Sequence, residues 1–267
     1  MTDLLRPIKK AVKKTPLWPV LRPRRIHVYN LGAGRTGTTA TTSIFSGTFR
    51  AGHEAHVAST VKLLSEYWSD SATEQKVRKK LISRDRKWRL EFESSPFLAG
   101  FAPLLVDVFS EAQFLVTVRP PKKWLRSNID KCINSPREEL KSHFLYLRDL
   151  NYGSPPEEYP PQETVLDHYK LHSLSGYLQY WAWHYETVLN GIPAGRRLLI
   201  KTSGLSDAIP KIAEFLNVSE EQLSQPSKEN KASKRHGVVA DIPQDYLDRM
   251  IDDHCGETIE RIRREVK

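Results

Sequence analysis

Apolar and polar positions along the chain follow a pattern that predicts short strands separated by helices. Strands are expected where β-favouring residues form short apolar runs, at 26–31, 88–92, 114–118 and 197–200. Apolar residues in the intervening segments predict helices at 38–45, 56–69, 72–84, 96–109, 122–132, 164–190, 209–216 and 243–265. Strands that alternate with helices indicate an α/β fold of three layers, α/β/α, with a central parallel sheet. Such sheets bind ligands outside the carboxyl ends of their strands.

The chain is expected to form one domain. Its 267 residues lie within the range of a single α/β domain, and the proline-rich segment 151–163 is interpreted as an exposed loop. Cys132 and Cys255 are far apart and lack neighbouring cysteines or histidines, so neither a disulfide framework nor a zinc site is expected. No apolar run approaches the roughly 18 to 20 residues that span a bilayer, and the N-terminus lacks the apolar segment of a signal peptide. A soluble, cytoplasmic protein is therefore predicted.

Positive charge is concentrated at the N-terminus. The chain has 41 lysines and arginines against 32 acidic residues, a net charge of +9. Residues 1–25 carry eight of these cations and only Asp3, which accounts for +7. The remainder, 26–267, is nearly neutral, so a nucleic-acid surface is not expected. The basic arm 1–25 is interpreted as solvated, or as a peripheral contact with anionic lipid, although its prolines would interrupt an interfacial helix.

A glycine-rich loop follows the first expected strand. Its sequence is Gly32-Ala33-Gly34-Arg35-Thr36-Gly37-Thr38-Thr39, and it lies where a strand passes into a helix. Backbone N–H groups and the helix dipole make that position an anion site, so phosphate binding is predicted. A glycine turn with a purely structural role is the alternative.

Two phosphate-binding patterns fit this loop incompletely. Gly32, Gly34 and Gly37 match the dinucleotide fingerprint, but no strand ending in an acidic residue is expected soon after the helix. Gly32 and Gly37 also match the start of a Walker motif, but Thr38 stands where that motif has lysine. A nucleotide kinase or another phosphotransferase of the P-loop type is the runner-up.

A third pattern fits without change. Arg35-Thr36-Gly37-Thr38-Thr39 resembles the loop with which sulfotransferases hold the 5′-phosphosulfate of 3′-phosphoadenosine-5′-phosphosulfate (PAPS). The resemblance implies that Arg35 steadies the bridging oxygen as the sulfur leaves. It also implies that Gly34 and the residues from Thr36 to Thr39 hold the 5′-phosphate through backbone and hydroxyl groups.

A second match lies after the third expected strand. Sulfotransferases grip the 3′-phosphate of the donor with an arginine at a strand end and a serine eight positions later, and Arg119 and Ser127 stand at this spacing. The polar segment 230–237 loosely resembles the basic loop that closes over the nucleotide, which would assign Lys234 and Arg235 to the donor. The resemblance covers residues 26–240. It implies a P-loop-like sulfotransferase fold, with 26–267 as a single catalytic domain.

The base that activates the acceptor is marked less clearly than the phosphate sites. Sulfuryl transfer needs a group that takes the proton of the attacking hydroxyl. Sulfotransferases use either a histidine after the second strand, which this chain lacks between residues 88 and 101, or a glutamate beyond the first helix. Glu54 is near the glutamate position and is the first candidate, with His53 and His56 beside it. Glu93, after the second expected strand, is the next candidate.

The sequence therefore predicts transfer of a sulfuryl group from PAPS to an acceptor hydroxyl by in-line displacement. Adenosine 3′,5′-bisphosphate (PAP) would be the second product, and no metal is expected. A carbohydrate or a glycolipid is the favoured acceptor, and nucleic acid is not expected as a partner. A nucleotide-binding regulatory domain without activity is the non-enzymatic alternative.

Overall fold

The computed structural model describes residues 22–227 and 234–266, and within them five strands form one parallel sheet. Across the sheet the strands are β2 (Ala51–His53), β3 (Phe92–Ser94), β1 (Val28–Asn30), β4 (Gln113–Val118) and β5 (Arg197–Lys201). β1 therefore lies between β3 and β4. In the dinucleotide-binding fold β1 lies beside β2, so the strand order separates the present fold from that class.

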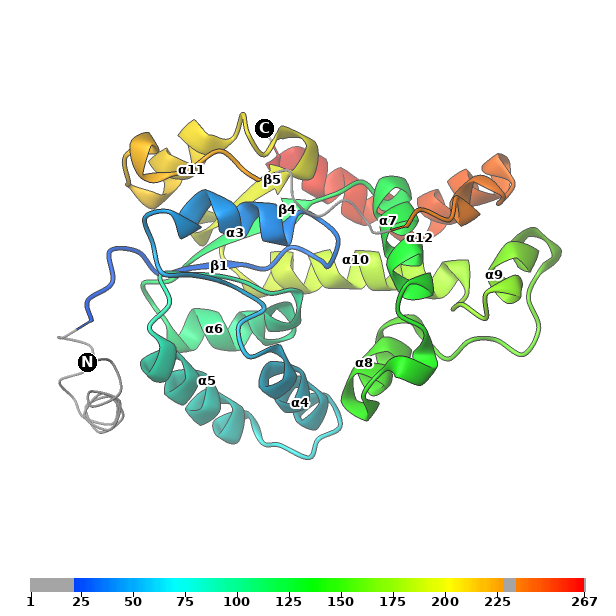
Figure 1. Cartoon of the computed structure of the whole chain (residues 1–267), viewed down its shortest axis with the longest axis horizontal. Coiled ribbons are helices and arrows are strands. Elements are labelled where there is room, and N and C mark those ends of the chain that lie inside the picture. Colours follow the sequence, from blue (N-terminus) through cyan, green and yellow to red (C-terminus); the bar gives the residue numbers. More distant parts are fainter. Residues whose placement is uncertain (1–21, 228–233, 267) are drawn as a thin grey trace.

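Helices cover both faces of the sheet (Figure 1). One face carries α3 (Thr38–Ser46) and α11 (Ile209–Leu216), and the other carries α4 (Val57–Trp68), α5 (Glu74–Trp88), α6 (Ala102–Val108) and α10 (Leu174–Gly191). Successive strand residues feed opposite faces, because side chains alternate along a strand. In β4, Phe114 and Val116 join the core under α10, whereas Leu115 joins the core under α3. The predicted three-layer α/β/α architecture is confirmed.

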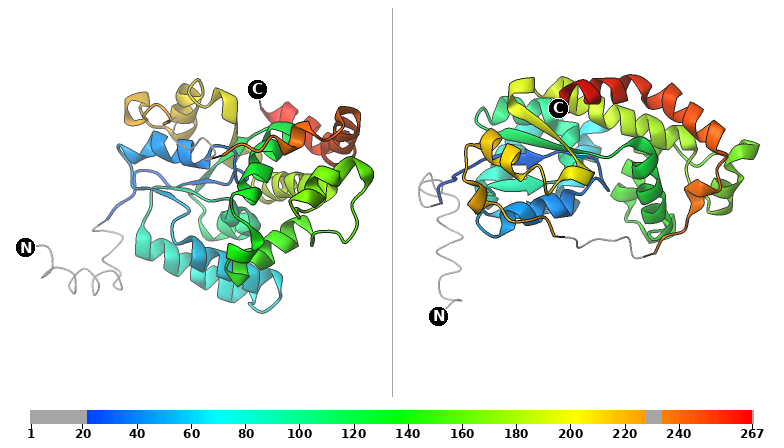
Figure 2. Two further views of the ribbon diagram at one scale, coloured as in Figure 1. Left: turned by 45° about the vertical axis from the view of Figure 1, so that its right-hand side comes forward. Right: turned by 90° about the horizontal axis from the view of Figure 1, so that it is seen from above.

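The other helices lie around these layers. They are α7 (Pro121–Ile133), α8 (Ser142–Tyr152), α9 (Thr164–His168) and α12 (Gln244–Glu265). α12 runs along α10 (Figures 1 and 2), while α7 and α8 lie on the side of the sheet where the strands end (Figure 1). In the part of the chain that the structure describes, no helix is both long and apolar enough to cross a membrane.

Two elements are absent from the sequence prediction. β2 was not predicted, because Ala-Gly-His has little β propensity and the strand pairs only with β3, at the sheet edge. Helix α8 was not predicted either. The strand expected at 88–92 lies later in the chain, because α5 continues to Trp88 and ends at Arg89, which has a left-handed φ of 50°.

The long helix expected at 164–190 is divided into two. Lys170 has a left-handed φ of 50°, which interrupts the helix after α9. α10 then begins after Ser173, whose hydroxyl accepts a hydrogen bond from the N–H of Gly176 at 3.1 Å. A side-chain cap of this kind stabilises the start of a helix.

Residues 22–25 are attached to the folded body. Arg24 pairs with Asp85, and Arg25 pairs through Nε with Glu91 at 3.1 Å. The Glu91 side chain is fully buried, and its contacts with Arg25 and Arg50 lower its pKa to about 2 against the effect of burial. The rest of the basic arm, 1–21, lies outside the described residues, so its contact with a membrane stays a prediction.

Candidate active site

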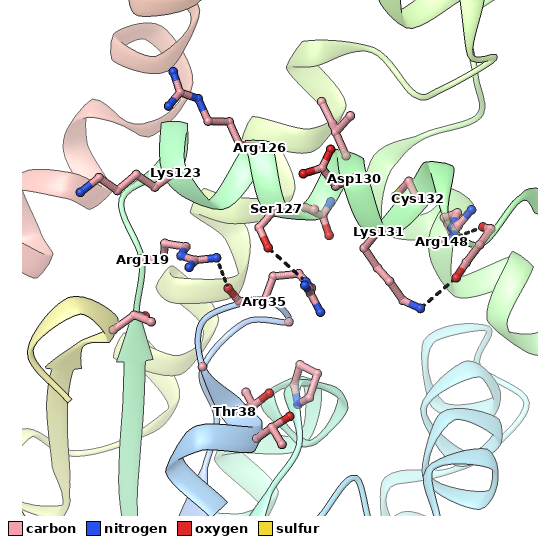
Figure 3. A pocket seen from close by; sticks show the side chains of 18 of the residues that line it. Arg35, Thr38, Arg119, Lys123, Arg126, Ser127, Asp130, Lys131, Cys132 and Arg148 are labelled. Atoms are coloured by element: carbon pink, nitrogen blue, oxygen red, sulfur yellow. Dashed lines mark hydrogen bonds between the residues drawn. The ribbon is translucent and has the colours of Figure 1, made fainter. Parts of the chain in front are cut away.

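A cavity of about 1240 Å³ opens at the carboxyl ends of the strands. Its walls come from the loop after β1, the residues after β2, helices α7 and α8, and the segment 235–240 (Figure 3). Most of the residues predicted for the site line it, namely Gly34, Arg35, Gly37, Thr38, Thr39, Glu54, Arg119, Ser127 and Arg235. Thr36, Glu93 and Lys234 do not line this cavity.

The loop after β1 turns backbone N–H groups toward the cavity. Arg35 and Gly37 have left-handed φ angles of 69° and 90°. The N–H groups of Thr38 to Ala40 belong to the first turn of α3 and have no intrahelical acceptor. Within residues 22–227 and 234–266 no other group accepts a hydrogen bond from them. Free N–H groups at a helix start, preceded by a left-handed turn, form an anion-binding site.

Contacts with β4 and β5 hold this loop in place. The hydroxyl of Thr36 donates to the carbonyl oxygen of Ala33 at 2.6 Å and lies 2.9 Å from the hydroxyl of Thr117. The hydroxyl of Thr202, after β5, donates to the carbonyl oxygen of Thr36 at 2.7 Å. Thr36 therefore has a structural position inside the loop, and its hydroxyl does not face the cavity as the family resemblance implied.

Helix α10 supports the same region from below the sheet. Three of its side chains donate to carbonyl oxygens at strand ends: His184 to Leu31 at 2.9 Å, Trp181 to Arg119 at 3.0 Å and Tyr185 to Thr117 at 3.0 Å. Burial lowers the pKa of His184 to about 4, so the ring is neutral at pH 7. These donors supply side-chain hydrogen bonds to carbonyl oxygens near the strand ends.

The two sequence motifs meet at Arg35. A guanidinium nitrogen of Arg119, Nη1, donates to the carbonyl oxygen of Arg35 at 2.8 Å, and Nε of Arg35 donates to the hydroxyl of Ser127 at 3.2 Å (Figure 3). Among the described residues no carboxylate pairs with either arginine. Burial and the nearby charge of Arg35 lower the pKa of Arg119. Two close guanidinium groups without an acidic partner are the arrangement expected where an anion binds.

Glu54 lies on the cavity wall directly after β2. Its N–H donates to the carbonyl oxygen of Ser94 at 2.8 Å, its φ is 47°, and its side chain is 34% exposed. His53 lies between this carboxylate and the phosphate loop. Its Nε2 is 4.0 Å from Oε1 of Glu54 and 3.0 Å from the hydroxyl oxygen of Thr38.

Two other base candidates, His56 and Glu93, lie away from the cavity wall. The ring of His56 stacks on Trp88 with 3.7 Å between ring centroids, and His56 does not line the cavity. The side chain of Glu93 is only 4% exposed and forms a two-point ion pair with Arg84, with 2.5 Å between Nη1 and Oε2. Glu93 therefore belongs to a buried ion pair and does not line the cavity.

The basic segment near the C-terminus contacts α7. The carbonyl oxygen of Lys234 accepts a hydrogen bond from Asn134 at 3.0 Å, and the N–H of His236 donates to Asp130 at 2.8 Å. Arg235, between them, lines the cavity, whereas Lys234 does not. Residues 228–233 of this segment lie outside the described part of the chain.

Sequence reasoning missed several cations of the cavity. Lys123 and Arg126 stand between Arg119 and Ser127 in the sequence, but the family pattern gave them no role. Lys131 and Arg148 also line the cavity. Arg148 could not be placed because α8 was not predicted. In the described residues no three histidine, cysteine or acidic side chains gather in a way that could hold a metal ion.

A family model matches most of the chain. The family model described as "Sulfotransferase domain" matches residues 27–233. The crystal structure of a sulfotransferase from Alicyclobacillus acidocaldarius is similar at 16% sequence identity and a TM-score of 0.49, covering 86% of this chain and 95% of that one. No curated protein sequence matches the chain.

Proposed function

The chain belongs to the sulfotransferase family, and from that premise we propose that it transfers a sulfuryl group from PAPS to a hydroxyl group of an acceptor. PAPS is proposed as the donor because Arg35 contacts both Arg119 and Ser127, and this group lies beside the free N–H groups at the start of α3. PAPS is anionic at both its 5′-phosphosulfate and its 3′-phosphate. Two separate anion sites joined through one loop fit such a molecule.

The 5′-phosphosulfate would bind the loop after β1. The N–H groups of Gly37 to Ala40 and the hydroxyls of Thr38 and Thr39 supply donors on the cavity wall. The 3′-phosphate would bind Arg119 and Ser127, with Arg235 entering from the segment near the C-terminus. A guanidinium group forms strong charge-assisted hydrogen bonds with phosphate oxygens.

In the reaction, the acceptor oxygen forms a bond to sulfur while the bond from sulfur to the bridging phosphate oxygen breaks. Arg35 would stabilise the negative charge that develops on that leaving oxygen. Glu54 would take the proton of the acceptor hydroxyl, because it is the first candidate for the base and its carboxylate lies on the cavity wall, where His53 lies beside it. PAP carries away the electron pair of the broken bond.

The proposal is tested by calorimetry with PAP and with adenosine 5′-phosphate. We expect PAP to bind more tightly, and Arg119→Ala to weaken PAP binding by about 10- to 150-fold, since one charge-assisted contact is worth about 1.5–3 kcal/mol. Binding of adenosine 5′-phosphate should change little. Arg263, which is 69% exposed on α12, provides the control variant Arg263→Ala.

Two results would contradict this assignment. Equal losses for both ligands in Arg119→Ala would remove Arg119 from a 3′-phosphate site. Tighter binding of ATP with Mg²⁺ than of PAP would instead favour the P-loop phosphotransferase.

A further inference from the structure

The cavity extends beyond the donor site toward α8. There its wall is built from apolar side chains of three segments, including Phe97 after β3, Ile129 on α7, and Leu140, Phe144 and Leu147 at α8. The rings of Phe97 and Phe144 contact edge to face, with 6.2 Å between centroids. We call the part of the cavity lined by these five residues the α8 lobe. Its surface matches an apolar molecule.

Two cations stand at this lobe, on the side away from Arg119 (Figure 3). Nζ of Lys131 donates to the hydroxyl of Ser135 at 2.8 Å, and Nη2 of Arg148 donates to the carbonyl oxygen of the same serine at 3.1 Å. Both cations line the cavity. Lys131 is four positions beyond Ser127, about one turn along α7, so it faces the same side of the helix.

No carboxylate neutralises this pair within the described residues. Asp149, next to Arg148 in the chain, is paired with Arg137, with 2.9 Å between Oδ2 and Nη2. Asp130, next to Lys131, also lines the cavity, but its Oδ1 accepts the N–H of His236 and it forms no ion pair with Lys131 or Arg148. Burial raises the pKa of the Cys132 thiol, and the charges of Arg148 and Lys131 oppose that rise. Neither Lys131 nor Arg148 thus forms an ion pair within the described residues, and the apolar lobe has these two cations at one end.

Resting on the proposed function, we infer that the acceptor combines its hydroxyl with an apolar body and an anionic group, and that Lys131 and Arg148 bind this group. The hydroxyl would lie at Glu54 and Arg35, the apolar body against Phe97 and Phe144. This acceptor differs from the carbohydrate expected from the sequence. Among the described residues that line the cavity there is no tryptophan, and the lobe offers mostly aliphatic and phenyl surface.

The inference is tested with matched acceptors that differ only in a carboxylate. The probes are 8-hydroxyoctanoate and 12-hydroxydodecanoate, each compared with 1-octanol and 1-dodecanol as acceptors for transfer from PAPS. We expect kcat/KM to be at least about 10-fold higher for the acids, because a charged contact contributes about 1.5–3 kcal/mol. Lys131→Gln and Arg148→Gln should each lower this acid preference by about 10-fold. Lys141→Gln, at an exposed lysine that does not line the cavity, is the matched control.

Calorimetry of 8-hydroxyoctanoate with the protein, alone and with PAP, tests the inferred acceptor site and the proposed donor site separately. Loss of acid binding in Lys131→Gln and Arg148→Gln with normal PAP binding supports the inference. Equal use of acids and alcohols, or an acid preference that survives both substitutions, overturns it while the donor assignment stands. Failure of the wild-type protein to bind PAP refutes the proposed function. In that case acid binding that depends on Lys131 and Arg148 still identifies an anion site in the lobe.

Discussion

Glu54 and Glu93 show how position decides the role of a carboxylate. Glu54 lies on the cavity wall and is partly exposed, so it can accept a proton from a bound hydroxyl. Glu54→Gln keeps the shape of the side chain but removes its basicity. We expect turnover to fall by about 10²- to 10⁴-fold, the range for a positioned general base, with PAP affinity unchanged. Steady-state rates and PAP calorimetry on the same preparation would measure both effects.

The same substitution at Glu93 is the matched control. Glu93→Gln leaves Arg84, whose side chain is only 15% exposed, without its carboxylate. Removing one partner of a buried ion pair costs about 3–5 kcal/mol, so the expected effect is a lower midpoint in urea unfolding. If Glu93→Gln is stable but inactive while Glu54→Gln is active, the assignment of the base is wrong.

Two glycines of the phosphate loop differ in what surrounds them. A Cβ atom on Gly32 would lie 2.0 Å from the hydroxyl oxygen of Thr117 and 2.7 Å from its carbonyl oxygen, whereas one on Gly34 would meet nothing within 4 Å. We therefore expect Gly32→Ala to destabilise the protein by about 1–3 kcal/mol, the usual cost of overpacking. Gly34→Ala should leave the unfolding midpoint near that of the wild type. Equal midpoints for the two variants would show that the loop can move away from β4.

His184 on α10, which contacts the end of β1, makes the stability of the fold depend on pH. The neutral ring of His184 donates through Nε2 to Leu31, so a second proton would add to Nδ1, which lies 3.4 Å from the hydroxyl of Tyr180, and would place a charge in a buried site. Its pKa is about 4 in the fold and 6.5 in the unfolded chain. Between these values the unfolded chain binds more protons, so stability falls as pH falls, by up to about 1.4 kcal/mol per pH unit.

His184→Gln removes this proton uptake while keeping a side-chain donor for Leu31. We expect the loss of unfolding free energy between pH 7 and pH 5, measured in urea, to shrink by about 2 kcal/mol. His172, whose pKa burial also lowers to about 4, should behave in the same way when changed to Gln. An unaltered pH dependence in both variants would mean that neither ring stays neutral in the native protein.

The sequence predicts best the elements that have a continuous or periodic apolar pattern. The strands at 114–118 and 197–200 and the helix at 209–216 agree with β4, β5 and α11, because each presents a continuous or periodic apolar pattern to the core. β2 carries no such pattern. It forms because β3 offers a parallel edge, and this is a contact between distant segments. α8 likewise depends on packing against α4 and α10. The local sequence pattern does not predict this packing.

The residues of the site also differ in whether the sequence alone can predict them. Arg35, Arg119 and Ser127 are found from the sequence because each stands at a fixed offset from a strand end. Lys131 and Arg148 are not, because they come from two different helices, α7 and α8, and meet at Ser135 only in the folded chain. The burial of Glu93 also depends on tertiary structure, since its partner Arg84 comes from α5, whose end was placed too early.

At the scale of the whole molecule, the strand order explains why one cavity can serve two substrates. β1 lies in the middle of the sheet, with β3 and β4 on either side, so the loop after β1 lies between the residues that follow its neighbours. Arg119 follows β4, and Phe97 follows β3. The phosphate loop thus meets the proposed 3′-phosphate site on one side and the proposed acceptor lobe on the other.

The N-terminal boundary of the folded body can be tested with two truncations. In the chain that begins at residue 22, Glu91 keeps hydrogen bonds from the N–H and Nε of Arg25 at 2.9 and 3.1 Å, and Asp85 keeps Arg24. A chain that begins at residue 26, the boundary expected from the sequence, loses these partners and leaves the Glu91 carboxylate buried beside Arg50. We expect the shorter chain to be less stable by about 3–5 kcal/mol at pH 7.

The pH dependence of this difference identifies its cause. The pKa of Glu91 is about 2 in the fold against 4.5 in the unfolded chain. Its contribution is therefore complete above pH 4.5 and is lost as pH falls toward 2. Without Arg25 the folded pKa should rise, so the stability of the shorter chain should depend less on pH in that window, and the two chains should converge in acid. Urea unfolding of both chains at pH 7 and at pH 3 measures this. Equal stability at pH 7 would place the boundary after residue 25, because residues 22–25 would then add nothing to the fold.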